Sequence, residues 1–299
     1  MKTITCLFLL CIILVKAEAQ DIEQFLSKYT QENGKKYMQP LADVIGANFN
    51  SGFIHSAKIR EMGFQMYLGL VTTTAFVPDK RKTFMAIPEG FFEPKNSVEV
   101  PTLFGPSENK IVNGNGGTQY VFPGGLNLKM LPLAMPQLTI GTVYGTDLTI
   151  RYFSFNFEEE IGKLNLFSWG LRHNISQYFK DIPVYLAVGI YNQYFMIGDL
   201  VDAKSWLFNL QSSYDLSIFT FYGALGYENS ILDLEYTYDD NGEETEQKFN
   251  MTGSNKARFT AGFTINLGPL KLNADYSVAS QSVLSLGLGL GFGDNKDDI

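Results

Sequence analysis

Two histidines, His55 and His173, are the side chains of this sequence best suited to acid–base chemistry. Ser56 follows His55 directly, and a serine beside a histidine suggests the nucleophile and general base of a phospholipase. Adjacent residues of a β-strand point to opposite faces, however, so this pair could not act together directly. His173 shares its strand parity with Trp169 and Leu171, which suggests a residue at a membrane interface. We therefore expect a protein that is not an enzyme.

The other motifs with chemical potential are weak. The glycine-rich run 114–117 lacks the lysine and the following helix of a phosphate-binding loop. The acidic stretch 239–243 could bind calcium weakly, but its spacing does not match an EF-hand, and we interpret it as a solvated charged loop. We expect no catalytic residue, no metal site and no cofactor.

A larger set of polar side chains alternates with apolar ones along strand-like segments. These side chains would face a hydrated lumen if the strands closed into a membrane barrel. The alternative is a polar network that merely fills a closed barrel, and the sequence leaves both interpretations open. The candidates for lining the lumen are Arg151, Asn209, Gln211, Arg258, Thr260, Thr264, Asn266, Lys271, Asn273 and Asp275.

The amino terminus predicts export. Lys2 precedes an almost wholly apolar run at residues 4–15, and an A-x-A cleavage site follows at 17–19. These are the features of a secretory signal peptide, residues 1–19, so the expected mature chain begins at Gln20.

Both cysteines, Cys6 and Cys11, fall inside this signal. The mature chain therefore has no disulfide, thiol nucleophile or zinc–thiolate site. A secreted chain of this size without disulfides favours a bacterial envelope.

Charge and hydropathy exclude other classes. The chain has a net charge of −8, and loss of the signal, with Lys2 and Lys16 against Glu18, leaves −9. Nucleic acid is an unsuitable partner for such a charge. No later segment approaches the ~20 apolar residues of a transmembrane helix. The aromatic content of 14% suits the girdles of a β-barrel, but also a β-sandwich.

The stretch 282–292, SVLSLGLGLGF, shows the strand pattern in its clearest form. Leucines and a final phenylalanine occupy one parity, and small residues occupy the other. A ridge of this kind faces either a second sheet layer or lipid. The pattern recurs from Pro136 to Phe292 in strands of ~10 residues, joined alternately by tight turns and longer loops, which favours an all-β antiparallel transmembrane barrel over a sandwich.

The tight turns fall on one side and the longer loops on the other, as expected for periplasmic turns and external loops. The segments after Pro136 supply nine strands, so we expect about twelve, within a range of ten to fourteen, with three drawn from residues 52–135. The expected barrel spans 51–292, with a long loop or insert at 77–135. Phe292 is the expected terminal signal for barrel assembly, followed by a polar tail at 293–299.

Residues 20–50 are expected to form a helical plug or lid at the periplasmic mouth. In the stretch 21–31, an apolar face at i, i+3, i+4 and i+7 predicts an amphipathic helix that ends at Asn33-Gly34. The residues of this face are Ile22, Phe25, Leu26 and Tyr29. A simple docking helix remains an alternative.

Several segments together resemble a known family. GFIHSAKIREMGFQMYLGL, LPLAMPQLTIGTVYGTDLTIRYF, WGLRHNISQYFKDIPVYLAVGIYNQ and GALGYENS are similar to an uncharacterised family of Gram-negative outer-membrane barrels. That family is distantly similar to the long-chain fatty-acid transporter barrels. The resemblance implies an outer-membrane barrel and, by analogy, uptake of hydrophobic compounds.

From these patterns and this resemblance we expect a porin-like channel or transporter for small hydrophobic compounds. The alternatives are a structural or adhesion barrel without transport, and a soluble secreted β-sandwich binding protein. The expected location is the outer membrane of a Gram-negative bacterium, reached through a cleaved signal peptide. The expected partners are outer-membrane lipid, the barrel-assembly machinery and small hydrophobic ligands, and no nucleic acid.

Overall fold

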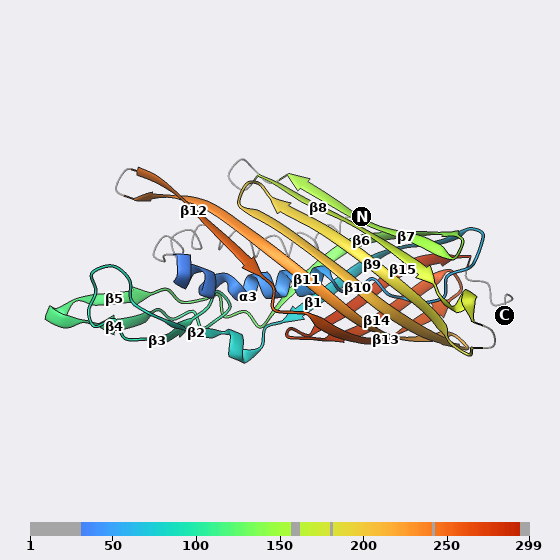
Figure 1. The fold of residues 1–299 in the computed structure, drawn as a ribbon, viewed down its shortest axis with the longest axis horizontal. Helices are drawn as coiled ribbons and strands as arrows, with labels where there is room; N and C mark the ends of the chain where they lie inside the picture. The colour runs from blue at the N-terminus through green and yellow to red at the C-terminus, as the bar shows by residue number, and fades with distance from the viewer. Residues whose placement is uncertain (1–30, 157–161, 180–181, 241–242, 294–299) are drawn as a thin grey trace.

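A closed antiparallel β-barrel forms the body of the molecule (Figure 1). The computed structural model describes residues 31–156, 162–179, 182–240 and 243–293. Within these residues ten strands form the ring, which closes where β10 pairs with β11. In order around the ring they are β1 (Gln65–Phe76), β6 (Met130–Val143), β7 (Thr146–Asn156), β8 (Lys163–Asn174), β9 (Tyr185–Ile197), β10 (Val201–Leu216), β11 (Phe219–Asp240), β13 (Ala257–Leu267), β14 (Leu270–Val278) and β15 (Val283–Phe292).

The alternation of residue types along the strands determines which face of the sheet lies outside the barrel. In β15 every second residue from Val283 to Gly291 is buried, while Leu284, Leu286, Leu288 and Leu290 are 37% to 54% exposed. The apolar ridge therefore lies on the outside of the barrel, and the small residues lie inside. β13 and β14 follow the same rule, with polar residues inward. The predicted antiparallel barrel is confirmed.

The expected number of twelve strands is wrong. Of the three strands expected from residues 52–135, only β1 is a separate wall strand in the described chain. The stretch 130–135 is instead the first part of β6, so the insert ends before Met130. Pro132 and Pro136 fit in β6 because its pairing with β7 begins only at Gln137, and a proline is tolerated on an unpaired edge.

The two ends of the barrel differ. One end, called here the turn end, carries the tight connections at 144–145, 217–218 and 268–269, the link with η3 (Ser176–Tyr178), and Phe292 at the end of β15. The opposite, loop end carries the insert at 77–129 and the connections that join β7 to β8, β9 to β10, and β11 to β13. The four predicted turns do fall together at the turn end. The predicted separation is only partial, however, because the loop end also carries the short connections 198–200 and 279–282.

A cap stands on the loop end (Figure 1). We define it as helix α3 (Gln31–Phe49), the insert 77–129, and the part of β11 that pairs with β12 (Glu243–Thr252), from Ile231 onward. The connection Asn241-Gly242 lies outside the described residues. In the insert, β2 (Thr83–Ala86) pairs with β3 (Val98–Pro101), and β4 (Lys110–Asn113) pairs with β5 (Gln119–Phe122). Two short 3-10 helices complete the described insert, η1 (Asp79–Arg81) and η2 (Asn115–Gly117).

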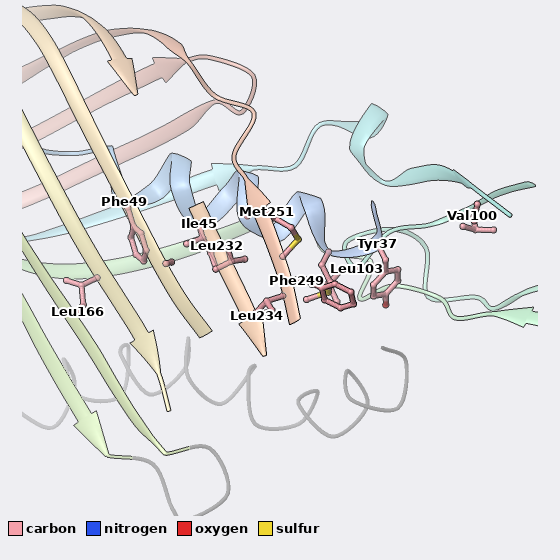
Figure 2. Close-up of a cluster of buried hydrophobic side chains, with 14 of the residues drawn as sticks. Tyr37, Ile45, Phe49, Val100, Leu103, Leu166, Leu232, Leu234, Phe249 and Met251 are labelled. Atoms are coloured by element: carbon pink, nitrogen blue, oxygen red, sulfur yellow. The ribbon is translucent and has the colours of Figure 1, made fainter. Parts of the chain in front are cut away.

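One apolar core joins the cap to the rim (Figure 2). Tyr37 and Phe49 of α3 belong to it, together with Leu103 of the insert and Phe249 of β12. Leu166 and Ala203 extend the same core onto the barrel strands. The cap therefore packs as a continuation of the barrel and not as a separate domain.

The amino-terminal helix differs from its expected place. The expected helix at 21–31 and its face of Ile22, Phe25, Leu26 and Tyr29 lie outside the described residues, as do the signal peptide and 294–299. The observed helix α3 contains Asn33-Gly34, which the sequence suggested as a helix end. It enters the loop-end mouth, not the end with the tight turns. No helix in the described ranges is long and apolar enough to cross a membrane.

Candidate functional site: the filled lumen

The chain itself occupies the lumen of the barrel. After α3 ends at Phe49, residues 50–60, called here the plug, run from the loop end to the turn end before β1 begins. At the loop end, Gln193 Nε2 donates to Asn50 Oδ1 over 3.1 Å. At the turn end, the amide of Thr142 donates to the carbonyl of Gly63 over 2.7 Å. Residues assigned to the wall by the sequence therefore lie inside it.

Barrel side chains hold the plug mainly through its backbone carbonyls. A carbonyl has two lone pairs and must be satisfied when it is buried. In the described plug, the carbonyl acceptors and their donors are Ser51 with Arg151 (3.0 Å), Phe53 with Gln137 (3.4 Å), His55 with Thr264 (2.6 Å), Ser56 with Arg172 (2.6 Å), Lys58 with Gln65 (3.2 Å) and Ile59 with Asn174 (2.7 Å). These donors come from β1, β6, β7, β8 and β13, so the wall grips the plug from several directions.

Aromatic stacking adds side-chain contacts. Phe53 stacks on Tyr191 with ring centroids 4.2 Å apart, and His55 stacks on Tyr67 at 4.3 Å. The guanidinium of Arg151 lies over the ring of Phe53, 3.6 Å from the ring centroid. Such stacked and cation–π contacts strengthen when they are removed from water. The plug therefore completes the surroundings of Arg151, whose guanidinium also bonds Gln137 Oε1.

Ion pairs fix the other lumen arginines on the wall. Arg172 binds Asp147 with both ends of its guanidinium, at 3.0 and 2.5 Å, and both side chains are almost fully buried. Arg258 binds Glu228 at 2.9 Å and also donates to the carbonyl of Ala47 at the end of α3. The bidentate pair of Arg172 fixes the plane of its guanidinium, whereas Arg258 reaches Glu228 through Nη2 alone. A carboxylate of the wall thus orients each of these arginines toward the plug.

One cavity beside the plug is small. A cavity of about 10 Å³ lies next to Ser51 and Phe53, with Arg258 and Asp275 among its lining residues. This is close to the minimum volume that holds one water molecule. In the part of the chain that the structure describes, this stretch of the lumen is therefore filled rather than open.

The structure places the ten sequence-predicted lining residues as follows. All except Asn266 are buried, and Asn266 is half-buried near the turn end, where it accepts from Lys271 Nζ. Arg151, Arg258 and Thr264 contact the plug or the end of α3. The others bond wall residues: Asn209 bonds Gln211, Gln211 bonds Tyr191, Thr260 bonds Ser277, Asn273 bonds Tyr67, and Asp275 bonds Tyr222.

Sequence reasoning missed other members of this site. Asp147, Thr149 and Arg151 share one parity of β7, so the inward position of Asp147 was available from the alternation. The same holds for Arg172 in β8, two residues after Gly170 and four after Ser168. The plug gave no such signal, because apolar and polar residues are mixed on both of its parities.

The residues considered for catalysis have other contacts. The ring of His55 stacks on Tyr67, and the hydroxyl of Ser56 lies 3.4 Å from that of Ser213. His173 lies at the turn end, where its ring nitrogens bond Thr146 Oγ1 and Tyr178 OH, each at 2.9 Å. Among the described residues, no group of three or more His, Cys, Asp and Glu side chains could hold a metal ion.

A buried carboxylate latches α3 to the connections that lead into β13 and β15, and to the insert. Asp43 accepts from the amide of Ser254 at 2.9 Å and from Gln281 Nε2 at 3.0 Å, and lies 3.7 Å from Arg81 of the insert. Nearby, Tyr37 donates its hydroxyl to the carbonyl of Gly124 at 2.8 Å. Burial raises the pKa of Tyr37 well above its usual range, so the phenol remains a neutral donor. These contacts hold the helix over the mouth.

Comparison with known proteins adds little about chemistry. No curated protein matches the sequence. Solved structures similar to this chain include Ail, the attachment invasion locus protein of Yersinia pestis, at 10% identity over 76% of this chain and 95% of Ail (TM-score 0.28). OmpT of Vibrio cholerae with loop L8 deleted gives 8% identity over 77% and 99% (TM-score 0.28). The β domain of the Bordetella autotransporter BrkA gives 12% over 77% and 99% (TM-score 0.30). TM-scores this low support no inference about function.

The family to which the chain belongs is clear from its sequence. The resemblance to an uncharacterised family is confirmed, whereas the distant similarity to fatty-acid transporter barrels stays a prediction. The sequence matches the family of unknown function DUF6588 over residues 1–292, and the chain belongs to that family.

Proposed function

We propose that this protein is an outer-membrane barrel, sealed by its own plug, which anchors the cap at the surface of the membrane. The observation that carries the proposal is the occupation of the lumen by residues 50–60. An open pore needs a hydrated path. Here the polar side chains of the wall donate hydrogen bonds to the carbonyls of the plug instead of to water. A sealed barrel without a path serves best as an anchor.

The distribution of polarity supports the membrane location. Large apolar side chains are exposed around the outer wall, among them Phe167, Ile190, Phe208, Leu225 and Phe263, while the inner wall carries buried ion pairs. A soluble barrel would have the opposite arrangement. With the predicted signal peptide, this arrangement favours the outer membrane of a Gram-negative bacterium, with the turn end in the periplasm.

The cap supports a binding or adhesion role over transport. Its insert exposes several large apolar side chains, Met85, Ile87, Phe91, Ile111 and Val121, and Ile111 lies opposite Val121 in the pairing of β4 with β5. Exposed apolar side chains on paired strands suit an interaction surface. The lumen, in contrast, presents several buried charges around the plug, an unsuitable path for small hydrophobic compounds. We do not assign catalysis to His55 or Ser56, because the ring of His55 stacks on Tyr67 and the hydroxyl of Ser56 lies beside that of Ser213.

Permeability tests this proposal. The purified full-length chain, checked for a mobility difference between unheated and boiled samples on a denaturing gel, is placed in planar bilayers. We expect no steady conductance, and no difference in uptake of a labelled fatty acid between cells with and without the protein. Steady conductance, or uptake that depends on the protein, would contradict a sealed anchor and favour the transporter.

A further inference from the structure

The path of the chain places its two described ends on opposite sides of the barrel. β15 ends at the turn end, where Phe292 pairs with Met66. β1 also begins there, but the plug precedes it and crosses the lumen to the loop end. The amino-terminal part of α3 then contacts the insert, where Asn33 Nδ2 donates to the carbonyl of Ile87 at 2.9 Å. The ring contributes an even number of crossings, and the plug adds one more.

We propose that the lumen is a binding site for an extended polypeptide, and that it carries the amino-terminal part of this chain through the outer membrane to the cell surface. The proposal rests on the outer-membrane location proposed above, with the turn end in the periplasm. The polypeptide bound in the site is the plug, residues 50–60, of the same chain.

The contacts of the plug fit recognition of an extended backbone. The wall donors bind carbonyls, which every residue supplies, so these bonds do not depend on the side chains that pass through. The donors also recur along the length of the lumen, from Arg151 near Ser51 to Asn174 near Ile59. A site for a compact small molecule would instead concentrate its polar groups at one place.

Plug side chains add contacts of their own to the carbonyl bonds. Asn50, Ser51, Ser56 and Arg60 hydrogen-bond Gln193, Arg258, Ser213 and Gly293. Phe53 and His55 stack on wall tyrosines, and Lys58 lies 3.8 Å from Asp215. These contacts set the register of the chain. Each of them needs a particular side chain at a particular level of the lumen, whereas every residue offers the same carbonyl. The wall thus holds an extended backbone through its carbonyls, and the side-chain contacts fix which residues of this chain lie at each level of the lumen.

The first test locates α3 in intact cells. The predicted mature chain has no cysteine, so single cysteines report one position each. The exposed Lys35→Cys on α3 and Glu61→Cys beside the turn end are reacted with a membrane-impermeant maleimide. Asp199→Cys at the loop end and Ser217→Cys at the turn end are matched references for the orientation of the barrel. We expect Lys35→Cys and Asp199→Cys to react in intact cells, and the other two only after the outer membrane is permeabilised.

The reference positions separate the possible failures. Reaction of Asp199→Cys but not Lys35→Cys in intact cells would overturn the surface location of the amino-terminal part while leaving the barrel in place. Reaction of Ser217→Cys and not Asp199→Cys would reverse the orientation and overturn the proposal as well. Recovery of the protein in the soluble periplasm would overturn the proposed function itself.

The second test examines the lumen as a peptide site. Ser56→Cys places a thiol of similar shape on the half-buried part of the plug, and its reaction rate with a small thiol reagent reports release of the plug. Thr264→Val removes the donor to the carbonyl of His55, and Thr260→Val is the matched control on the same strand, because Thr260 bonds the wall residue Ser277. We expect Thr264→Val to accelerate the reaction roughly two- to tenfold, the equivalent of one hydrogen bond. Equal rates in the two variants, with the gel mobility of the folded barrel retained, would overturn the proposal.

Discussion

The wall of the barrel and the plug inside it satisfy their backbones in different ways. Wall strands such as β14 bond their neighbours on both sides through a ladder of amides and carbonyls. The plug has no such ladder over most of its length, and its carbonyls accept from side chains of the wall. The wall can therefore hold its conformation from pairing alone, whereas the plug depends on the positions of wall side chains.

This difference separates two kinds of failure. A substitution that disturbs the wall is expected to lower the stability of the whole barrel, because every strand belongs to one closed ring. A substitution that disturbs only the plug or the latch of the cap is expected to open the lumen while the barrel persists. Heat-modifiable mobility on gels reports the first property, and conductance in planar bilayers reports the second.

The largest effect is expected from the buried pair of Arg172 and Asp147. Arg172→Met leaves the carboxylate of Asp147 buried without its partner, and such a loss typically costs about 3–5 kcal/mol. The temperature at which the folded gel band disappears should fall, and the plug should loosen at Ser56. Lys204→Met is the control, since its pair with Asp202 is exposed and should contribute less than about 1 kcal/mol. Similar effects in both variants would contradict the importance of burial.

The next largest loss of stability is expected from a charge on the outer face of the wall. Leu288→Lys introduces a charge near the middle of β15, which costs about 2–4 kcal/mol if that face meets the centre of a bilayer. Leu284→Lys, closer to the loop end of the same strand, should cost only about 0–1 kcal/mol. Equilibrium unfolding from lipid vesicles measures both variants. Equal losses of unfolding free energy in the two variants would contradict contact between the leucines of β15 and lipid. The contacts on the inner face would then be the main source of stability.

The latch on α3 tests how the cap is held at the loop end, with no substitution in a wall strand. Asp43→Ala removes the acceptor of the Ser254 amide and of Gln281, and hydrogen bonds to a charged group are worth about 1.5–3 kcal/mol each. We expect faster proteolysis of the insert and brief openings in planar bilayers, with a stable barrel. Asp79→Ala is a control, because this carboxylate of the insert is exposed and bonds only its neighbour Lys82 among the contacts described. Loss of the folded barrel in Asp43→Ala would mean that the cap is required for the wall.

Gly52 tests the entry of the plug into the lumen. Its φ of +71° favours glycine, and a Cβ there would lie 2.5 Å from a methyl of Val71. Gly52→Ala should therefore cost about 1–3 kcal/mol, displace the plug and raise conductance. Gly90→Ala has a similar φ of +66° but open space around it, so it supplies the backbone strain without the clash. An unchanged seal in Gly52→Ala would show that the plug adapts at this position.

The same contrast explains what the sequence could predict. The strands from Leu138 to Phe292 were readable, because one-sided burial imposes alternation on every wall strand. The inward positions of nine of the ten candidate residues follow from that rule. The strand number was not readable, because most of residues 52–129 form the plug and the cap insert, and only β1 of that region joins the wall.

The plug could not be predicted by alternation, for a physical reason. Phe53, Ile54, His55, Ala57 and Ile59 are all buried, since the wall surrounds the segment on every side. Burial on all sides removes the period of two that marks a strand and leaves no period of its own. The partners that satisfy its carbonyls lie up to 209 positions away along the chain, so no local pattern records them.

The smallest effect is expected on the solvent side of α3, where the cap meets neither the wall nor the plug. Glu32 and Lys36 form an i,i+4 pair with 3.4 Å between charged atoms, and their side chains are 84% and 47% exposed. Such a pair contributes about 0.3–0.5 kcal/mol and weakens as salt screens it. Lys36→Met should therefore leave conductance and proteolysis of the insert unchanged at high salt, and alter them barely at low salt. An effect as large as that of Asp43→Ala would mean that contacts on the exposed face of α3 hold the helix in place. The contrast between a plug held by the wall and a helix surface exposed to solvent would then be wrong.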